Sequence, residues 1–300
     1  MTPDDVLTIR ADGETIAECA LWWRLTPFVG GRRAGYVGRY CCNDRRAGRV
    51  LLQTAKQLLA KAGCHTAIGP VDGSTWHRYR FVTERFDEPP FFLEPDNPDA
   101  YPQDFLDSGF APCAHYVSAE ETHLERVDER ALRSLHRLTA MGVTIRHIDP
   151  LRYLEELDRF YDVARKSFAS ALLFTPVARE AFCALYEPLQ DLVDPAYVRI
   201  AEHEGRTVGF AFGIPDHNAR RGGRPLDTLV GKTQAVLPEL RYGGLGAVML
   251  EEVRREAHER GMRRIIHALI RDDNVALNGC RRVATQMRGY TLYACGVPNA

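Results

Sequence analysis

The chain has 300 residues, 45% of them hydrophobic, which suits two domains of about 150 residues with ordinary cores. Its 39 Lys and Arg nearly balance its 40 Asp and Glu, and the formal net charge of −1 argues against a nucleic-acid partner or an acidic membrane surface. The start Met1–Asp5 lacks the basic and apolar parts of a signal peptide, and no apolar run approaches a membrane span. We therefore expect a cytoplasmic protein without a membrane partner.

The cysteine and histidine spacings contain no metal-site pattern. None of the eight cysteines forms a Cys-x-x-Cys pair, and none of the ten histidines stands at zinc spacing from a cysteine. We expect reduced thiols and no bound metal.

The first part of the chain predicts a hairpin, a strand, a helix and a further strand. Short apolar runs on either side of Asp12-Gly13 are typical of a β-hairpin, and a helical apolar spacing ends at a glycine. The predicted elements are the hairpin over 7–18, a strand over 35–42, a helix from Ala47 to Gly63 and a strand over 65–68.

The second part repeats this order. Glu204-Gly205 separates two apolar runs, and a later helical spacing again ends at a glycine, Gly261. The predicted elements are strands over 197–202, 207–213, 229–236 and 265–270, a helix from Gly246 to Gly261, a helix from Asn274 to Met287, and a Gly289-Tyr290 turn into a last strand.

The glycine-rich turn at 241–246 lies between a strand and a helix, where backbone N–H groups can hold phosphate. A P-loop needs Lys-Ser/Thr after its last glycine, but Ala247 follows Gly246. The dinucleotide fingerprint needs a third glycine, but Met249 stands there. The remaining pattern, Arg/Gln-x-x-Gly-x-Gly/Ala after a strand, fits Arg241, Gly244 and Gly246.

This turn and its surrounding elements resemble the acyl-CoA pyrophosphate loop of the GNAT superfamily of N-acyltransferases. The resemblance implies an α/β fold with a mixed α+β sheet and acetyl-CoA, or another acyl-CoA, as co-substrate. It places a GNAT domain with an acyl-CoA-binding loop at 141–300.

The first part resembles a degenerate and truncated GNAT-like domain over 1–125. Gly48 and Gly63 have the same spacing as Gly246 and Gly261, and Gly- and Pro-rich segments over 68–110 resemble tandem GNAT-like bacterial proteins. In this copy Asn43, Arg45 and Arg46 replace Arg241, Gly243 and Gly244, and side chains at 45 and 46 would crowd a pyrophosphate. We expect one acyl-CoA site per chain.

The resemblance also implies roles for single residues. Asn274 is either a cofactor contact or an ordinary helix cap, and His267 is either the base that takes the amine's proton or a core histidine. Arg241 would point toward phosphate oxygens. The implied cofactor-binding residues are Ala235, Val236, Leu237, Arg241, Tyr242, Gly243, Gly244, Leu245, Gly246, Ala247 and Asn274.

Two classes of function follow from this resemblance. The first is an acetyl-CoA-dependent N-acyltransferase acting by direct transfer on the amine of a small-molecule or amino-acid-like acceptor. The second is a catalytically silent acyl-CoA sensor or interaction protein, because the helix that often carries a catalytic tyrosine has none. Either would be a monomer with an internal pseudo-dimer, or a homodimer.

Overall fold

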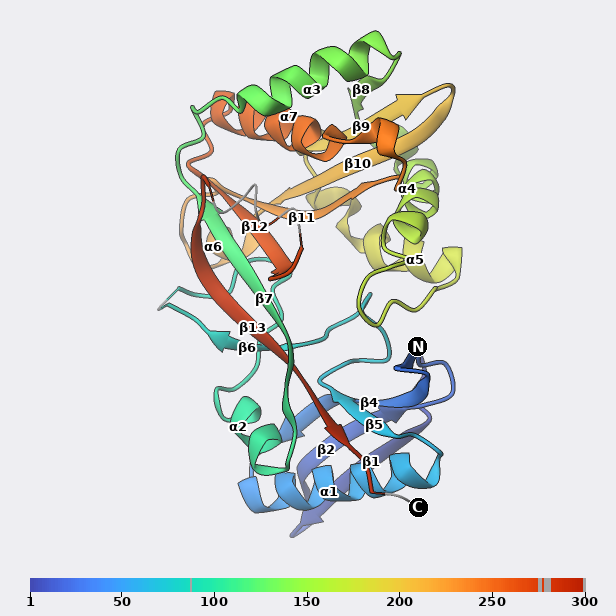
Figure 1. The fold of residues 1–300 in the computed structure, drawn as a ribbon. Coiled ribbons are helices and arrows are strands. Elements are labelled where there is room, and N and C mark those ends of the chain that lie inside the picture. Colours follow the sequence, from blue (N-terminus) through green and yellow to red (C-terminus); the bar gives the residue numbers. More distant parts are fainter. Residues whose placement is uncertain (87, 275–276, 278–281, 299–300) are drawn as a thin grey trace.

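Two similar runs of strands and helices share one mixed sheet in the computed structural model, which describes residues 1–86, 88–274, 277 and 282–298 (Figure 1). The elements up to residue 125 are β1 (Asp5–Ala11), β2 (Glu14–Trp22), β3 (Phe28–Val29), β4 (Arg32–Cys42), α1 (Arg45–Lys61), β5 (Thr66–Gly69), β6 (Phe81–Glu84), α2 (Ala100–Asp107) and β7 (Ala111–Glu121). We call this part the amino-terminal half.

The carboxy-terminal half follows from residue 126. Its helices are α3 (Glu129–Ala140), η1 (Pro150–Arg152), α4 (Tyr153–Ser167), α5 (Arg179–Tyr186), η2 (Glu187–Leu192), η3 (Pro195–Tyr197), α6 (His217–Arg221), η4 (Leu240–Tyr242) and α7 (Leu245–Glu259). Its strands are β8 (Thr144–His147), β9 (Val198–His203), β10 (Arg206–Pro215), β11 (Thr228–Val236), β12 (Arg264–Arg271) and β13 (Thr285–Gly296).

The two halves repeat one pattern of strand pairing. In the first, β1, β2 and β4 pair antiparallel and β4 pairs parallel with β5. In the second, β9, β10 and β11 pair antiparallel and β11 pairs parallel with β12. A helix crosses over between the parallel strands in both cases, α1 in the first half and α7 in the second, because parallel neighbours need a long connection. The α/β fold with two tandem halves is therefore confirmed.

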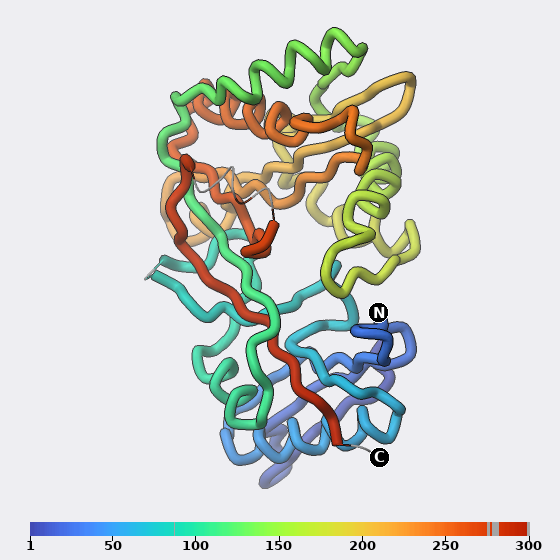
Figure 2. The backbone as a smooth tube through the Cα atoms, viewed as in Figure 1, coloured from blue at the N-terminus to red at the C-terminus, as the bar shows by residue number. Residues whose placement is uncertain are grey.

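The last strand of each half completes the sheet of the other half. β7 pairs with β12, whereas β13 pairs with β5. The two strands also pair antiparallel with each other, from Thr285↔Glu120 to Ala294↔Ala111. Figure 2 shows them running side by side from one half to the other. The sheet is therefore continuous, in the order β1-β2-β4-β5-β13-β7-β12-β11-β10-β9-β8.

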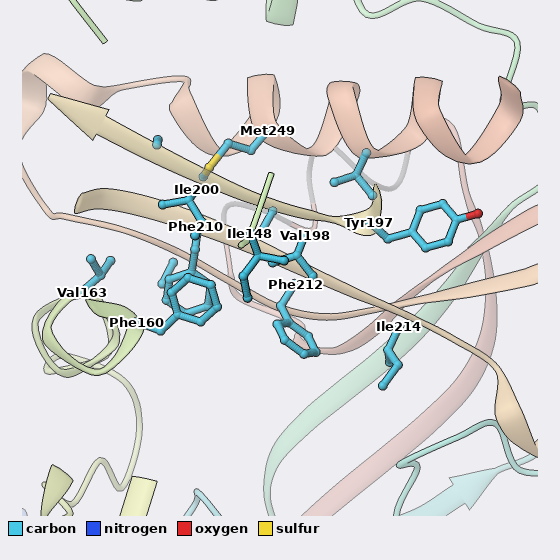
Figure 3. Close-up of a cluster of buried hydrophobic side chains, with 14 of the residues drawn as sticks. Ile148, Phe160, Val163, Tyr197, Val198, Ile200, Phe210, Phe212, Ile214 and Met249 are labelled. Atoms are coloured by element: carbon cyan, nitrogen blue, oxygen red, sulfur yellow. The ribbon is translucent and has the colours of Figure 1, made fainter. Parts of the chain in front are cut away.

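The core of the carboxy-terminal half lies between this sheet and its helices. On α7, Val253 and Ala257 are buried at helical spacing, as expected from the sequence, and Val248 and Met249 are buried beside them. On the other face, Phe160 of α4 stacks on Phe210 of β10 with ring centroids 4.2 Å apart (Figure 3). Each such buried side chain stabilises the fold by about 1.5–3 kcal/mol, so α7 is held firmly at the position where its first turn meets the cavity described below.

The predicted helix up to Met287 and the turn at Gly289-Tyr290 are wrong for the residues that the structure describes. β13 begins at Thr285 and includes Gly289, which pairs with Val117 and Glu84. A Cβ at Gly289 would lie 2.6 Å from the Glu84 carboxylate, so this glycine allows a close approach within a strand. The remainder of the predicted helix falls largely outside the described residues.

The domain bounds 1–125 and 141–300 stay a prediction, because β7 and β13 each belong to the sheet of both halves. Within the described ranges, no helix is both long and apolar enough to cross a bilayer. The same ranges contain no group of three or more His, Cys, Asp or Glu suited to holding a metal ion.

Candidate functional site

Helix α7 begins without a side-chain cap. Its N-cap is Gly244, in the left-handed region with φ of 84°, and no side chain of the described residues bonds to the first N–H groups of the helix. The first turn, from Leu245 to Ala247, has no intrahelical acceptors for these N–H groups. Together with the helix dipole, they form a site for an anion.

Two contacts hold the loop that precedes α7. The Arg137 guanidinium of α3 donates to the carbonyls of Arg241 (2.9 Å) and Gly243. The Tyr242 side chain is buried, and its hydroxyl lies 3.0 Å from Nδ1 of His203. The loop carbonyls are thus turned toward α3, which fixes the backbone where the helix begins.

Gly244 is required by close packing as well as by conformation, since a Cβ there would lie 2.5 Å from the Ser134 hydroxyl. A Cβ at Gly246 would lie 2.6 Å from the Gln234 amide, which is the end of a flexible side chain and can move aside. Substitution at Gly244 is therefore strained twice, by its positive φ and by Ser134.

The sheet opens beside this helix. β11 and β12 pair from Thr228↔Arg264 to Gly231↔His267 and then separate. A register shift in the pairing of β10 with β11 occurs at the same level, between Phe212 and Gly213, and such bulges increase the local twist. Over 232–236, β11 pairs only with β10 in the described part of the chain, so its second edge offers backbone groups to a ligand.

A cavity of about 1840 Å³ connects three places: the fork where β11 and β12 separate, the start of α7, and the amino-terminal half. Pockets for one ligand hold about 300–1,000 Å³, so this cavity has room for two substrates. Its walls include aromatic side chains such as Phe168, Phe174 and Phe212. The charged residues of the wall are more often basic (Arg78, Arg80, Arg126, Arg130, Arg133, Lys232, Arg254, Arg271, Arg282) than acidic (Glu94, Glu121, Asp128, Glu129, Glu251).

A buried imidazole–carboxylate pair lies where the strands separate. Nε2 of His267 on β12 is 2.9 Å from Oε2 of Glu121 on β7, and both side chains are about 5% exposed or less. An ionised carboxylate only accepts hydrogen bonds, so Nε2 donates to Glu121. Arg254 lies 3.7 Å from the other Glu121 oxygen, so this carboxylate contacts a guanidinium as well as the imidazole.

Burial alters the proton affinity of two further groups on the wall. It raises the pKa of the Tyr116 hydroxyl, which therefore keeps its proton at neutral pH. It lowers the pKa of His77, with a further contribution from the positive chain terminus, so this imidazole favours its neutral form. Neither residue was singled out from the sequence as a member of a site.

The structure brings together part of the predicted set. Val236, Tyr242, Gly244, Gly246, Ala247, His267 and Asn274 line the cavity, whereas Ala235, Leu237, Arg241, Gly243 and Leu245 lie outside its lining. The role of every one of these residues as a ligand contact stays a prediction.

The Arg241 side chain lies among carboxylates, and its expected contact with phosphate oxygens stays a prediction. Its guanidinium forms ion pairs with Glu239 at 2.9 Å and Glu204 at 3.5 Å, because these carboxylates lie close to it in the turn. Arg130 and Arg133 of α3 lie on the wall with Gly244 instead. These exposed arginines were missed because only the packing of α3 against α7 places them beside the loop.

In the amino-terminal half, a carboxylate of the chain itself caps the start of the equivalent helix. Asp44 is the N-cap of α1, and its carboxylate accepts a hydrogen bond from the Ala47 N–H at 2.7 Å. Lys61 lies as many residues after Gly48 as Glu259 lies after Gly246, so the two helices end at equivalent positions. Because α1 begins earlier than α7, its first residues take the position that the glycine-rich loop has in the other half.

The fork of the amino-terminal half is also filled by the chain. Beyond the last β4–β5 pair, the Val71 N–H donates to the Val37 carbonyl at 3.0 Å, and the Arg39 N–H donates to the Asp72 carboxylate at 2.6 Å. Both features that form the open site in the carboxy-terminal half are therefore occupied here by protein atoms.

Comparison with known proteins gives a family match. Residues 157–282 match the acetyltransferase (GNAT) family. The bacterial ceramide synthase of Caulobacter vibrioides is 24% identical over 189 residues, which are 63% of this chain and 49% of that protein. Protein YghO of Escherichia coli is 22% identical over 63% of this chain and 48% of its own. The chain thus spans about half the length of these curated relatives.

Solved structures give the same fold. The GCN5-related N-acetyltransferase of Anabaena variabilis superposes with a TM-score of 0.57 over 98% of this chain and 63% of its own, at 11% identity. Because the superposition includes nearly all of this chain, the likeness of fold extends to the amino-terminal half.

Proposed function

The chain is a GNAT-superfamily protein with two GNAT-like halves, and we propose that it transfers an acyl group from acetyl-CoA or another acyl-CoA to the amine of a small acceptor. The observation that carries this proposal is the meeting of three features in one cavity: the uncapped start of α7, the open edge of β11 and the His267–Glu121 pair.

The carboxy-terminal half has the features that such a co-substrate needs. The N–H groups at Gly244, Leu245 and Gly246 would hold the pyrophosphate, with Arg130 and Arg133 close to its charge. The open edge of β11 would pair with the pantetheine arm. Bound there, acyl-CoA supplies an activated thioester, and one backbone N–H of the bulged strand would polarise its carbonyl.

His267 is the general base in this proposal. Its imidazole takes a proton from the acceptor amine, while Glu121 orients the ring and stabilises the imidazolium. The departing thiolate needs one proton, and His267 can return the one that it took, so a single imidazole balances the reaction. Positioned acid–base groups of this kind contribute about 10²–10⁴-fold to rate.

The acceptor would enter from the side of the amino-terminal half. Segment 75–80 of that half lines the cavity, together with Phe168 and Phe174 of the other half. One relative bears the name ceramide synthase, and a ceramide is an amide, which fits an amide-forming reaction here. A largely apolar wall accommodates the carbon skeleton of an amine.

A turnover assay tests the proposal. The chain is mixed with acetyl-CoA and a panel of primary amines, and free thiol is measured. Thiol release that depends on the amine supports the proposal. Binding of acetyl-CoA without release by any amine would contradict it and would favour an acyl-CoA sensor.

A further inference from the structure

Arg80 is a buried cation on the wall of the shared cavity. It follows the segment that fills the fork of the amino-terminal half, and it is 6% exposed. Its guanidinium carbon lies 3.9 Å from the ring centroid of Tyr79 and 4.2 Å from that of Tyr116. The two rings fix the plane of the guanidinium and stabilise its charge by cation–π contact.

No carboxylate of the described residues lies within ion-pair distance of Arg80, which distinguishes it from the other buried arginines. Arg199 pairs with Glu252 at 3.2 Å, Arg254 with Glu251, and Arg288 with Glu94 at 3.1 Å. A buried charge is costly unless it is paired. Three of the buried arginines are paired with a carboxylate, whereas the fourth, Arg80, lines the cavity.

The hydrogen bonds of Arg80 are also incomplete. Nη1 donates to the Leu269 carbonyl over a long 3.5 Å, and Nε has no hydrogen-bond partner in the described part of the chain. A guanidinium has five N–H donors in a planar fork that matches a carboxylate or a phosphate. The unused donors therefore fit the planar edge of an anion.

The backbone at Arg80 is strained as well. Its φ is 64°, a left-handed conformation that non-glycine residues rarely adopt, while its N–H donates to the Pro70 carbonyl at 2.9 Å. Strain of this kind is kept where the surrounding structure imposes it, often at a ligand site. The conformation places a cation of the amino-terminal half on the wall of a cavity that serves the other half.

We infer that Arg80 binds an anionic group, a carboxylate or a phosphate, on the acceptor amine. The inference rests on the proposed function and names the class of acceptor. Leu269, whose carbonyl accepts from Arg80, stands two residues after His267 on β12, at an irregularity of the strand. Arg80 and His267 both line the shared cavity, so one acceptor can present its anion to the first and its amine to the second, and the amino-terminal half selects the acceptor.

The test compares matched amines that differ only in charge. The carboxylate pair is 4-aminobutyrate and 4-aminobutyramide, and the phosphate pair is O-phosphoethanolamine and ethanolamine. Wild type should prefer one or both anionic members, and the preferred pair identifies the anion. Arg80→Met should lower kcat/KM for that member by about 30-fold or more, mostly through KM, since hydrogen bonds to charged groups have this strength. The kcat/KM values for the neutral amines and the KM for acetyl-CoA should not change.

Two further variants make the result specific. Arg49→Met removes an exposed arginine of α1 that lies outside the cavity lining and should leave the preference intact. Arg80→Lys keeps the charge without the fork and should fall between wild type and Arg80→Met. Arg80→Met should fold, because exchanging a buried unpaired charge for an apolar side chain is often neutral or stabilising.

Calorimetry with CoA present separates failure of this inference from failure of the proposed function. Wild type should bind 4-aminobutyrate or O-phosphoethanolamine, and Arg80→Met should not, even if no amine is acylated. If wild type binds neither anion, or if folded Arg80→Met keeps the preference of wild type, the inference is overturned and the acyltransferase proposal stands unaffected.

Discussion

Glu121 and His267 form a hydrogen bond of 2.9 Å across the boundary between the two halves of the chain. Glu121 ends β7, the strand that the amino-terminal half contributes to the other sheet, and His267 lies where β12 leaves β11. The exchange of strands therefore orients the imidazole of the site.

His267→Gln should lower kcat by about 100-fold or more, the usual contribution of a positioned general base. The affinity for acetyl-CoA should stay within twofold, because the loop at Gly244 does not involve this side chain. Glu121→Gln should have a smaller effect, and the double variant should be no slower than His267→Gln, since the pair acts as a unit. Steady-state kinetics measures all three, and full activity in His267→Gln would exclude it as the base.

Asp44→Ala should destabilise the protein without changing the binding of acetyl-CoA. The carboxylate caps α1 through the Ala47 N–H, and loss of such a cap costs about 1 kcal/mol. Urea unfolding and calorimetry measure the two effects separately. Weaker binding of acetyl-CoA in a folded Asp44→Ala variant would mean that the start of α1 is itself a ligand site.

The chain should unfold in one cooperative transition, because the exchanged strands β7 and β13 connect the sheets of both halves. Trp76 adds to this connection, with its indole N–H donating to the Thr175 carbonyl at 2.9 Å. All three tryptophans lie within residues 22–76, so their fluorescence reports mainly on the amino-terminal half. Its unfolding curve in urea should coincide with that of far-ultraviolet circular dichroism, and two separate midpoints would disagree with this interpretation.

Glu256 makes the stability of the α7 region depend on pH. Its hydrogen bond from Arg260, aided by Arg199 and His147, holds the pKa of this carboxyl below its usual range. A lowered pKa in the folded state gives stability that is present above the unfolded value of about 4.3 and is lost as pH falls through the folded value.

Glu256→Gln should therefore lower the free energy of unfolding by about 1 kcal/mol at pH 7. This difference between wild type and variant should shrink as acid protonates the wild-type carboxyl. Glu259→Gln, on the same helix but more exposed, is the matched control and should show little difference at either pH. Urea unfolding of the three proteins at pH 7 and below pH 4 measures the effect. A constant difference across this range would disprove the assignment.

Local patterns predicted much of the carboxy-terminal half. The turn at Glu204-Gly205, the glycines around Gly244 and the apolar spacing of α7 are signals within a few residues, and the structure has the hairpin and the helix there. The start of β13 was missed because Thr285 to Met287 gives no local signal stronger than the neighbouring helical spacing, and its pairing with β7 decides the outcome.

The rest of the candidate site depends on contacts between distant residues. Glu121 meets His267, and Arg137 meets the carbonyls before Gly244, only through the packing of β7 and α3. The unsatisfied Nε of Arg80 has no signal in a single sequence, because it depends on which of the described residues surround it in space. Short-range patterns cannot reveal such features.

The central claim is that acyl-CoA binds once per chain, at the uncapped start of α7. Ala247 is an exposed residue of that first turn, where an acidic side chain favours the helix dipole, so Ala247→Glu should fold normally. The same charge opposes a pyrophosphate by about 4 kcal/mol at 4 Å and an effective dielectric of 20. Arg46→Glu, in the first turn of α1, is the matched control.

Calorimetric titration with acetyl-CoA is the most direct measurement. We expect one site in wild type, unchanged affinity in Arg46→Glu, and a loss of several hundred-fold in Ala247→Glu, since each 1.4 kcal/mol is about tenfold. Two equivalent sites in wild type, or normal binding by folded Ala247→Glu, would contradict the account.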